Sequence, residues 1–313
     1  MNSDRPSEGR LRCESEIEAA GARARGFSRI PGARVAGTFL VLAVTAVLAT
    51  GGPGWLAMLG SPAEARGAQP PASSVQRVSH DRWDRILKMY VSEEGWVDYE
   101  ALRRSSEREL DAYLRDIARV DSSKLGRREQ IALWLNAYNA LCVRILIDQG
   151  LPRTVPRRSV LGIGTNIFKI EKYRIAGKKR SLDDIEHGIL RKRYDEPRVH
   201  AALVCGASSC PRLRPEAYTA VRLDRQLDEE CRRWIREGVD LKGRRKNRLD
   251  RKKKTFYASR IFSWFKKDFG GSNRGVLDFV AKFASEEDAK FLRENDVRVS
   301  FLDYDWSLNR AGV

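Results

Sequence analysis

Residues 127–149 carry the longest helical pattern in the chain, and this segment constrains the fold more than any other. Apolar side chains recur there at three- and four-residue spacing: Ile131, Trp134, Leu135, Tyr138, Leu141, Cys142, Ile145 and Leu146. Gly150 and Pro152 end the pattern. Because so long an apolar stripe must be covered by other elements, the segment predicts a helix-rich core.

The remaining patterns predict more helices than strands. Helical spacing of apolar residues marks segments at 79–91, 110–117, 181–192, 223–237, 259–269 and 276–283. Extended patterns are short and fall at 95–99, at a hairpin beginning near 172, and at predicted strands 199–204, 256–258 and 297–301. Because the strands do not alternate regularly with helices, we expect a helix-rich α+β domain around a small sheet.

The N-terminal part of the chain has the composition of a tail and a targeting segment. Residues 1–34 lack apolar periodicity and are predicted to be disordered. Residues 35–59 are apolar and uncharged, and arginines precede them. They match the apolar region of a signal peptide, with Ala63-Glu64-Ala65 as a cleavage site. The uncharged run that continues to residue 63 is also long enough for a transmembrane anchor.

Both interpretations of residues 35–59 stay open, and both place the same part of the chain outside the cytoplasm. Arginine before the apolar segment favours a cytoplasmic N-terminus. Residues 60–75 are predicted to be a linker and residues 76–313 the globular domain. We therefore expect either a single-pass protein of the cell membrane or a secreted or periplasmic protein cleaved near Ala65.

The chain is strongly basic, with a formal net charge of +17. Residues 242–254 contribute about half of this charge in one Lys/Arg-rich run. The run can contact an anionic surface, or it can simply be a solvated loop. No aromatic residue is interleaved with it, which argues against a nucleic-acid module, since such modules combine basic residues with stacking aromatics.

A histidine and two cysteines lie close together in the sequence Val-His-Ala-Ala-Leu-Val-Cys-Gly-Ala-Ser-Ser-Cys-Pro at 199–211. His200 falls on the predicted strand, and Cys210 ends the small-residue loop after it. A thiol needs a base or a positive field to become the nucleophilic thiolate. Cys210 is therefore a candidate nucleophile, with His200 or His187 as its base. The remaining histidine, His80, is expected to be exposed.

Asn136 and Asn139 lie on one face of the long predicted helix. Their amides can orient an imidazole or bind a reacting oxygen, and backbone N–H groups of loop 206–208 can face an oxyanion. The alternative is that both asparagines hydrogen-bond neighbouring loops. His200 can likewise be a hydrogen-bonded core residue and Cys210 a small buried hydrophobic residue.

Two other uses of the cysteines compete with a nucleophile. Outside the cytoplasm, Cys205 and Cys210 can form a disulfide. Together with His187 and His200 they also have the ligand types of a metal site, although the spacing matches no familiar one. The sequence implies no cofactor.

Several strings of the chain, in order, resemble the family of unknown function DUF547. They are the strings at 95–99, 134–141, 184–190, 199–211, 216–218, 259–264, 268–270 and 302–306. The resemblance spans about 80–310. It implies that Asn136, Asn139, His187, His200 and Cys210 fall in the family's signature strings, with Cys205 in a common form of the motif. It implies no activity, and it makes the basic run 242–254 a local addition.

Two hypotheses of function follow. The first is an exported or membrane-anchored thiol hydrolase or acyl transferase, in which Cys210 is the nucleophile and Asn136 or Asn139 orients the base or donates to an oxyanion. The second is a non-catalytic binding or scaffold domain with a structural Cys205–Cys210 disulfide. The sequence does not identify a substrate or a protein partner.

Overall fold

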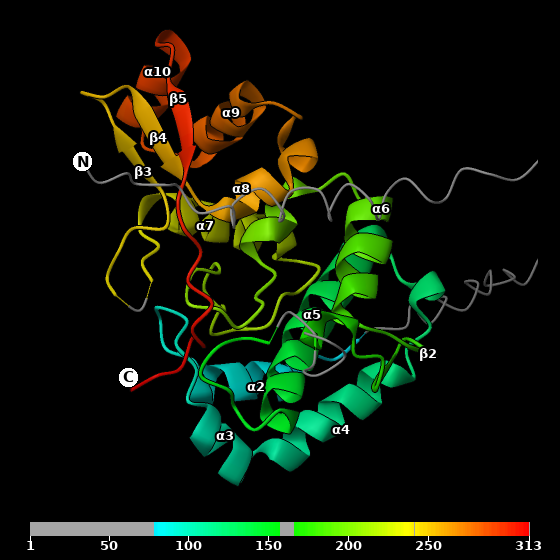
Figure 1. Cartoon of the computed structure of the whole chain (residues 1–313). Coiled ribbons are helices and arrows are strands. Elements are labelled where there is room, and N and C mark those ends of the chain that lie inside the picture. Colours follow the sequence, from blue (N-terminus) through cyan, green and yellow to red (C-terminus); the bar gives the residue numbers. More distant parts are fainter. Residues whose placement is uncertain (1–77, 157–165, 241, 313) are drawn as a thin grey trace, which may run out of the picture. The chain divides into compact units, whose positions relative to one another are not determined.

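The structure is a computed structural model, and it describes residues 78–156, 166–240 and 242–312 (Figure 1). The predicted tail at 1–34, the apolar segment at 35–59, the linker at 60–75 and the cleavage site all lie outside the described residues. The described part is helix-rich with small sheets, which agrees with the predicted α+β class.

Helix α5 (Arg127–Asp148) is the predicted long helix, and its burial confirms that it is the centre of a core. Helices α2 (Asp81–Tyr90), α3 (Tyr99–Ser105) and α4 (Glu107–Ala118) pack nearby (Figure 1). By length and composition α5 is the one described helix that could cross a membrane, but 89% of its most apolar window is buried inside the protein. That burial is typical of a core helix in a folded domain.

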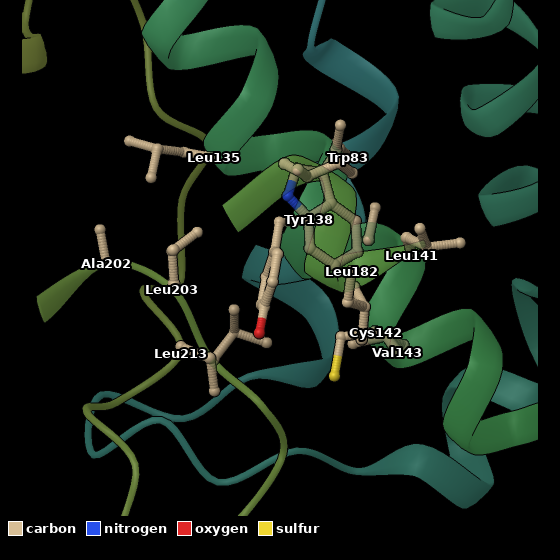
Figure 2. Close-up of a cluster of buried hydrophobic side chains, with 14 of the residues drawn as sticks. Trp83, Leu135, Tyr138, Leu141, Cys142, Val143, Leu182, Ala202, Leu203 and Leu213 are labelled. Atoms are coloured by element: carbon tan, nitrogen blue, oxygen red, sulfur yellow. The ribbon is translucent and has the colours of Figure 1, made fainter. Parts of the chain in front are cut away.

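The first hydrophobic core joins α5 to distant parts of the chain. Tyr138 lies at its centre, among Leu141 of the same helix, Trp83 of α2 and Leu203 (Figure 2). Trp83 and Tyr138 are 1% and 2% exposed. The segment around Leu203 is therefore held against the middle of α5 by apolar packing.

A second hydrophobic core lies under a three-stranded sheet. Strand β4 (Thr255–Ala258) pairs antiparallel with β3 (Arg248–Asp250) and parallel with β5 (Arg298–Phe301). The parallel pair requires a long connection, which here contains α8 (Arg260–Trp264), η5 (Lys266–Phe269), α9 (Asn273–Phe283) and α10 (Glu286–Glu294). Helix α7 (Leu223–Arg236) contributes Trp234 to this core. The strands predicted at 256–258 and 297–301 are confirmed, whereas β3 falls inside the basic run.

The remaining elements are short. They are η1 (Ser122–Lys124), η2 (Ile167–Lys169), the hairpin strands β1 (Arg174–Ile175) and β2 (Lys178–Lys179), the π-helix η3 (Asp184–Leu190) and α6 (Arg191–Arg193). Ser181 and Asp184 form the predicted reciprocal cap before η3. The predicted hairpin is confirmed by the antiparallel β1–β2 pair.

The strand predicted at 199–204 is wrong. Pro197 opens the 3-10 helix η4 (Pro197–Ala201), and the Glu196 side chain caps it by accepting from Arg198 N–H. Proline is favoured at the first helical position because its fixed φ suits a helix and its missing N–H needs no partner there. The effect of Pro197 outweighs the apolar run at 199–204, because a short apolar run is compatible with either a strand or a buried helix. His200 consequently lies on a helical turn.

The C-terminal segment returns from β5 to the first core and pairs with the cysteine loop, as the red trace shows (Figure 1). Ser208 N–H donates to Ser307 O at 2.7 Å, and Asn309 N–H donates to Gly206 O at 2.8 Å. Gly206 has φ +81°, and a Cβ there would lie 2.5 Å from Leu146 Cδ1, so this position requires glycine. These contacts place Tyr304 beside the cysteine loop.

Candidate active site

Cys210 Sγ lies among hydrogen-bond donors. The N–H of Cys205 and the hydroxyl of Tyr304 each donate to the sulfur at 3.1 Å. The Tyr304 hydroxyl is also 3.5 Å from Cys205 Sγ. The ammonium of Lys246 donates to the Cys210 carbonyl. We call these four residues, Cys205, Cys210, Lys246 and Tyr304, the thiol cluster.

The donors of the thiol cluster favour the charged form of Cys210. Burial raises the pKa of Cys210, but hydrogen bonds from Cys205 and Tyr304 and the charge of Lys246 outweigh it, so the pKa falls to about 7. Burial and the neighbouring Cys210 sulfur raise the pKa of Cys205 well above its usual value. Burial also lowers the pKa of Lys246 to about 8. One thiol of the pair is therefore polarised towards thiolate and the other is held as thiol.

A pocket of about 170 Å³ adjoins the thiol cluster. Tyr304, Lys246 and Ser209 are part of its lining. Tyr304 also packs against Trp264, with ring centroids 4.9 Å apart, and Trp264 is 40% exposed. Cys210 itself is 3% exposed. It is connected to the pocket by Tyr304, which contacts its sulfur, and by Lys246, which contacts its carbonyl.

His200 belongs to a second group of polar residues. Its Nε2 lies 2.7 Å from Asp268 Oδ2, and Arg191 also holds that carboxylate in a bidentate contact at 2.5 and 3.0 Å. The imidazole stacks on Phe265 with centroids 4.3 Å apart. Burial lowers the pKa of His200, although Asp268 opposes the shift. His200 and Arg191 overcome the effect of burial and lower the pKa of Asp268 well below its usual range.

The π-helix η3 supplies Glu186 and His187 to the same group. Glu186 accepts a hydrogen bond from Tyr138 at 3.2 Å, and its Oε1 lies 4.0 Å from His200 Nδ1. Burial raises the pKa of Glu186 to about 7. His187 Nδ1 lies 2.8 Å from an Arg191 guanidinium nitrogen, and its side chain is 45% exposed. We call Glu186, His187, Arg191, His200 and Asp268 the histidine cluster.

The predicted pairing of Cys210 with a histidine base is not present. In the described part of the chain, no hydrogen bond joins Cys210 to His187 or His200. The reason is the helical turn of η4, which directs His200 towards Phe265 and Asp268. Tyr304 and Lys246 lie beside the thiol instead.

The two asparagines clamp backbone segments. Asn136 donates to Tyr218 O at 2.8 Å and accepts from Tyr218 N–H at 3.0 Å. Asn139 makes the same pair of bonds, each at 3.0 Å, with Ala202 O and Val204 N–H. Both side-chain amides are thus engaged in holding loops to α5, and within the described residues neither forms a hydrogen bond with Cys210 or His200.

Two further expectations differ from the structure. Of the loop 206–208 donors that were expected to face an oxyanion, the Ser208 N–H instead donates to Ser307 O. His80 is buried: its Nδ1 lies 2.8 Å from the Tyr113 hydroxyl, and burial lowers its pKa to about 4.

Neither of the alternative uses of the cysteines is seen. Cys205 and Cys210 are free thiols in the structure. Within residues 78–156, 166–240 and 242–312, no group of three or more His, Cys, Asp or Glu side chains is arranged to hold a metal ion. The candidate ligands His187 and His200 are instead engaged by Arg191 and Asp268.

Two residues of the thiol cluster were not expected from the sequence. Lys246 lies in the basic run, yet it is 7% exposed. Tyr304 is 94 residues from Cys210. The string at 302–306, which contains Tyr304, resembles DUF547, and it is the sequence signal that could have identified this residue. The strand β3 that follows Lys246 gives the structural reason for its burial. Nothing in the sequence distinguishes this lysine from its neighbours.

The fold and the site together define a helix-rich α+β protein with a buried, polarised thiol beside a pocket. Residues 122–235 match the family model described as "Protein of unknown function, DUF547". The resemblance to DUF547 is therefore confirmed over these residues, which include both cysteines of the thiol cluster. Lys246, Asp268 and Tyr304 lie beyond the matched residues. No curated protein and no solved structure matches the chain.

Proposed function

We propose that this protein is a thiol-dependent hydrolase or acyl transferase with Cys210 as its nucleophile. The observation that carries the proposal is the pair of donors, Cys205 N–H and Tyr304 O–H, each 3.1 Å from the sulfur, with the Lys246 charge nearby. Donors of this kind stabilise thiolate without a histidine, because a hydrogen bond to the charged form lowers the pKa. Tyr304 contacts the reacting atom and is proposed as a catalytic residue.

The reaction begins with attack of the Cys210 thiolate on the carbonyl carbon of an ester or thioester. A C–S bond forms, and the bond to the leaving group breaks with its electron pair going to that group, which takes up a proton. The Lys246 ammonium can supply this proton because its lowered pKa of about 8 suits proton transfer near neutral pH. Water or another acceptor nucleophile then cleaves the thioester and regenerates the thiol.

The histidine cluster is proposed to stabilise the fold and not to act on the substrate. Asp268 contacts His200 on one side and is held by Arg191 on the other, and in the described part of the chain no hydrogen bond joins His187 or His200 to Cys210. The contacts of this cluster tie η3, η4 and η5 together.

The test is acylation of the full chain by S-acetyl and S-succinyl thioesters of N-acetylcysteamine. We expect release of free thiol and, in intact-mass and peptide spectra, an acyl group on Cys210. Cys210→Ala should lose both signals, while the matched variant Cys231→Ala, which removes a buried cysteine of α7, should keep them. Absence of both an adduct and turnover in the unmodified chain would overturn the proposal.

The scaffold hypothesis has its own supporting observation, since the Tyr304 hydroxyl lies within 3.5 Å of both sulfurs and the thiols interact directly. A stable disulfide would leave no nucleophile. Peptide mass spectrometry of the chain isolated without reductant separates the two: a Cys205–Cys210 disulfide that thiol probes do not label supports the scaffold, and labelled Cys210 contradicts it.

We also propose that residues 66–313 act outside the cytoplasm, tethered through residues 35–59 or released by cleavage near Ala65. The proposal is supported by the uncharged apolar segment and the arginines before it. A membrane-impermeant thiol or amine probe on intact cells should label the domain. Protection from the probe until the cells are lysed would contradict this location.

A further inference from the structure

The pocket beside the thiol cluster has an unbalanced charge. Its lining contains four cationic residues, Arg244, Arg245, Lys246 and Arg260, and two acidic ones, Asp240 and Asp303. We propose that this pocket binds a carboxylate or phosphate group, and that substrates acylating Cys210 carry such a group. The proposal rests on the proposed function and adds a substrate class to it.

The cations of the pocket differ in how well acids already neutralise them. Arg244 is paired with Asp240 at 2.7 Å and approaches Asp305 at 3.5 Å. Arg260 is 4.0 Å from Asp303, whose side chain is fully exposed. Such a long, solvated pair contributes little, so Arg260 keeps most of its capacity to bind an anion.

Arg245 and Lys246 are less completely neutralised. In the part of the chain that the structure describes, no carboxylate forms an ion pair with either residue, although the charges of Cys210 and Asp240 act on Lys246. Lys246 is 7% exposed and donates to a carbonyl oxygen, which carries no full charge. A buried cation without an acid is costly, and an anionic ligand in the pocket would offset that cost.

The neighbouring pocket provides an internal contrast. Lys246 also lines it, but its other charged residues are Glu94, Glu230, Glu237, Arg212 and Arg233. Glu230 there is held by both Arg212 and Arg214 at 2.8 Å. Cations and acids are thus balanced in that pocket, in contrast to the one that Tyr304 lines.

The position of the pocket connects the anion to the reacting sulfur. Tyr304 lines the pocket and its hydroxyl contacts Cys210 Sγ at 3.1 Å. Lys246 likewise lines the pocket and donates to the Cys210 backbone. An acyl group whose anionic end lies among Arg245 and Arg260 can therefore approach the thiol along the side that Tyr304 and Lys246 form.

Two alkylating reagents that differ in charge test this without any substrate. For each thiol we take the ratio of the iodoacetate rate to the iodoacetamide rate. We expect this ratio to be about tenfold higher for Cys210 than for a small free thiol, because nearby cations concentrate the anion. The preference should shrink as salt is raised. The ratio of the two rates is followed by peptide mass spectrometry on the full chain.

The variant Arg245→Gln combined with Arg260→Gln should reduce this ratio by about tenfold. The matched control is Arg248→Gln, which removes an arginine of the same basic run that lines a different pocket and stacks on Tyr257. It should leave the ratio unchanged. Equal ratios in the unmodified chain and the double variant, or an equal loss in the control, would overturn the proposal.

A binding measurement keeps this inference distinct from the proposed function. Succinate and inorganic phosphate are titrated separately against the full chain carrying Cys210→Ala, with intrinsic tryptophan fluorescence and calorimetry as readouts. Saturable binding that is lost in the Arg245/Arg260 double variant supports the pocket even when no thioester is turned over, and the tighter anion identifies the source. Turnover of acetyl and succinyl thioesters at equal kcat/KM, with no anion binding, would retain the function and reject the substrate class.

Discussion

Cys210 and His200 are equally buried, each 3% exposed, yet their polar surroundings differ in kind. His200 faces the Asp268 carboxylate, which Arg191 holds from the other side. The Cys210 sulfur accepts from an N–H and a phenolic O–H, a lysine binds the Cys210 carbonyl, and among the described residues no carboxylate hydrogen-bonds to the sulfur. The histidine cluster balances its own charges, whereas the thiol cluster favours a negative charge on the sulfur.

This difference separates two roles that the sequence combines in one string. A cluster in which each charge already has an opposite charge beside it contributes to stability, because removing one residue of the cluster leaves a buried charge without a partner. A group surrounded only by donors has spare capacity to carry charge, which a nucleophile requires. We therefore expect substitutions in the thiol cluster to change reactivity more than stability, and those in the histidine cluster to do the reverse.

The largest expected effect is at the sulfur itself. Cys210→Ala should reduce thioester turnover by on the order of 10⁴-fold or more, as removal of a nucleophile does. The free energy of unfolding should fall by only about 1 kcal/mol, typical of a small change in a core. Thiol-release assays and urea unfolding measure the two quantities. Turnover that survives in Cys210→Ala would place the chemistry elsewhere.

The opposite result is expected for Asp268→Ala. It leaves Arg191 and His200 without their shared carboxylate, so the free energy of unfolding should fall by about 3 kcal/mol. The alkylation rate of Cys210 in the folded protein should change by less than about threefold, since the two clusters share no hydrogen bond.

The control for Asp268→Ala is Asp278→Ala, which removes the exposed i,i+4 partner of Arg274 at 2.8 Å. An exposed pair of this kind contributes less than about 0.5 kcal/mol. Urea unfolding followed by circular dichroism compares the two variants. Equal losses in both, or a Cys210 rate that falls with Asp268→Ala, would remove the distinction between the clusters.

A pH-dependent effect follows from Glu186. Burial raises its pKa to about 7 from the ordinary value of 4.5, so between these values the folded state binds more protons than the unfolded state. Stability associated with Glu186 is therefore full below pH 4.5 and declines as pH rises towards 7. Above that range, Glu186→Gln should raise the free energy of unfolding by about 2 kcal/mol.

His200 provides the counterpart of opposite sign. Because burial lowers its pKa, the unfolded state binds more protons below pH 6.5, and stability declines as pH falls through that region. Urea unfolding of the unmodified chain and of Glu186→Gln between pH 5 and 8 measures both trends. A Glu186→Gln difference that does not grow with pH would show that the carboxyl is ionised at little cost.

Much of the fold follows from sequence patterns that extend over several turns. The apolar spacing of α5, the reciprocal cap of Ser181 and Asp184, and the two strands at β4 and β5 are confirmed at nearly the predicted residues. In α5 many side chains repeat the same signal. The strand predicted around His200 failed because a six-residue apolar run carries no such repetition, and Pro197 decided the conformation.

The site was only partly predictable, for a related reason. Cys210 was identified because it lies next to other unusual residues. Tyr304 reaches its sulfur from 94 residues away and Lys246 reaches its carbonyl from 36 residues away. Such contacts depend on how the C-terminal segment and β3 return to the first core. No local pattern encodes them, and a lysine within a basic run looks the same whether it is buried or exposed.

The smallest expected effect tests the donor that the sequence did not reveal. Tyr304→Phe removes the hydroxyl that donates to Cys210 Sγ and keeps the ring that packs on Trp264. Loss of one hydrogen bond to the thiolate should raise the pKa of Cys210 by about one unit from about 7. Tyr257→Phe on β4, outside the thiol cluster, is the matched control. The midpoint of the iodoacetamide rate against pH measures the pKa independently of access to the sulfur. An unchanged midpoint would assign the polarisation of Cys210 to Cys205 and Lys246 alone.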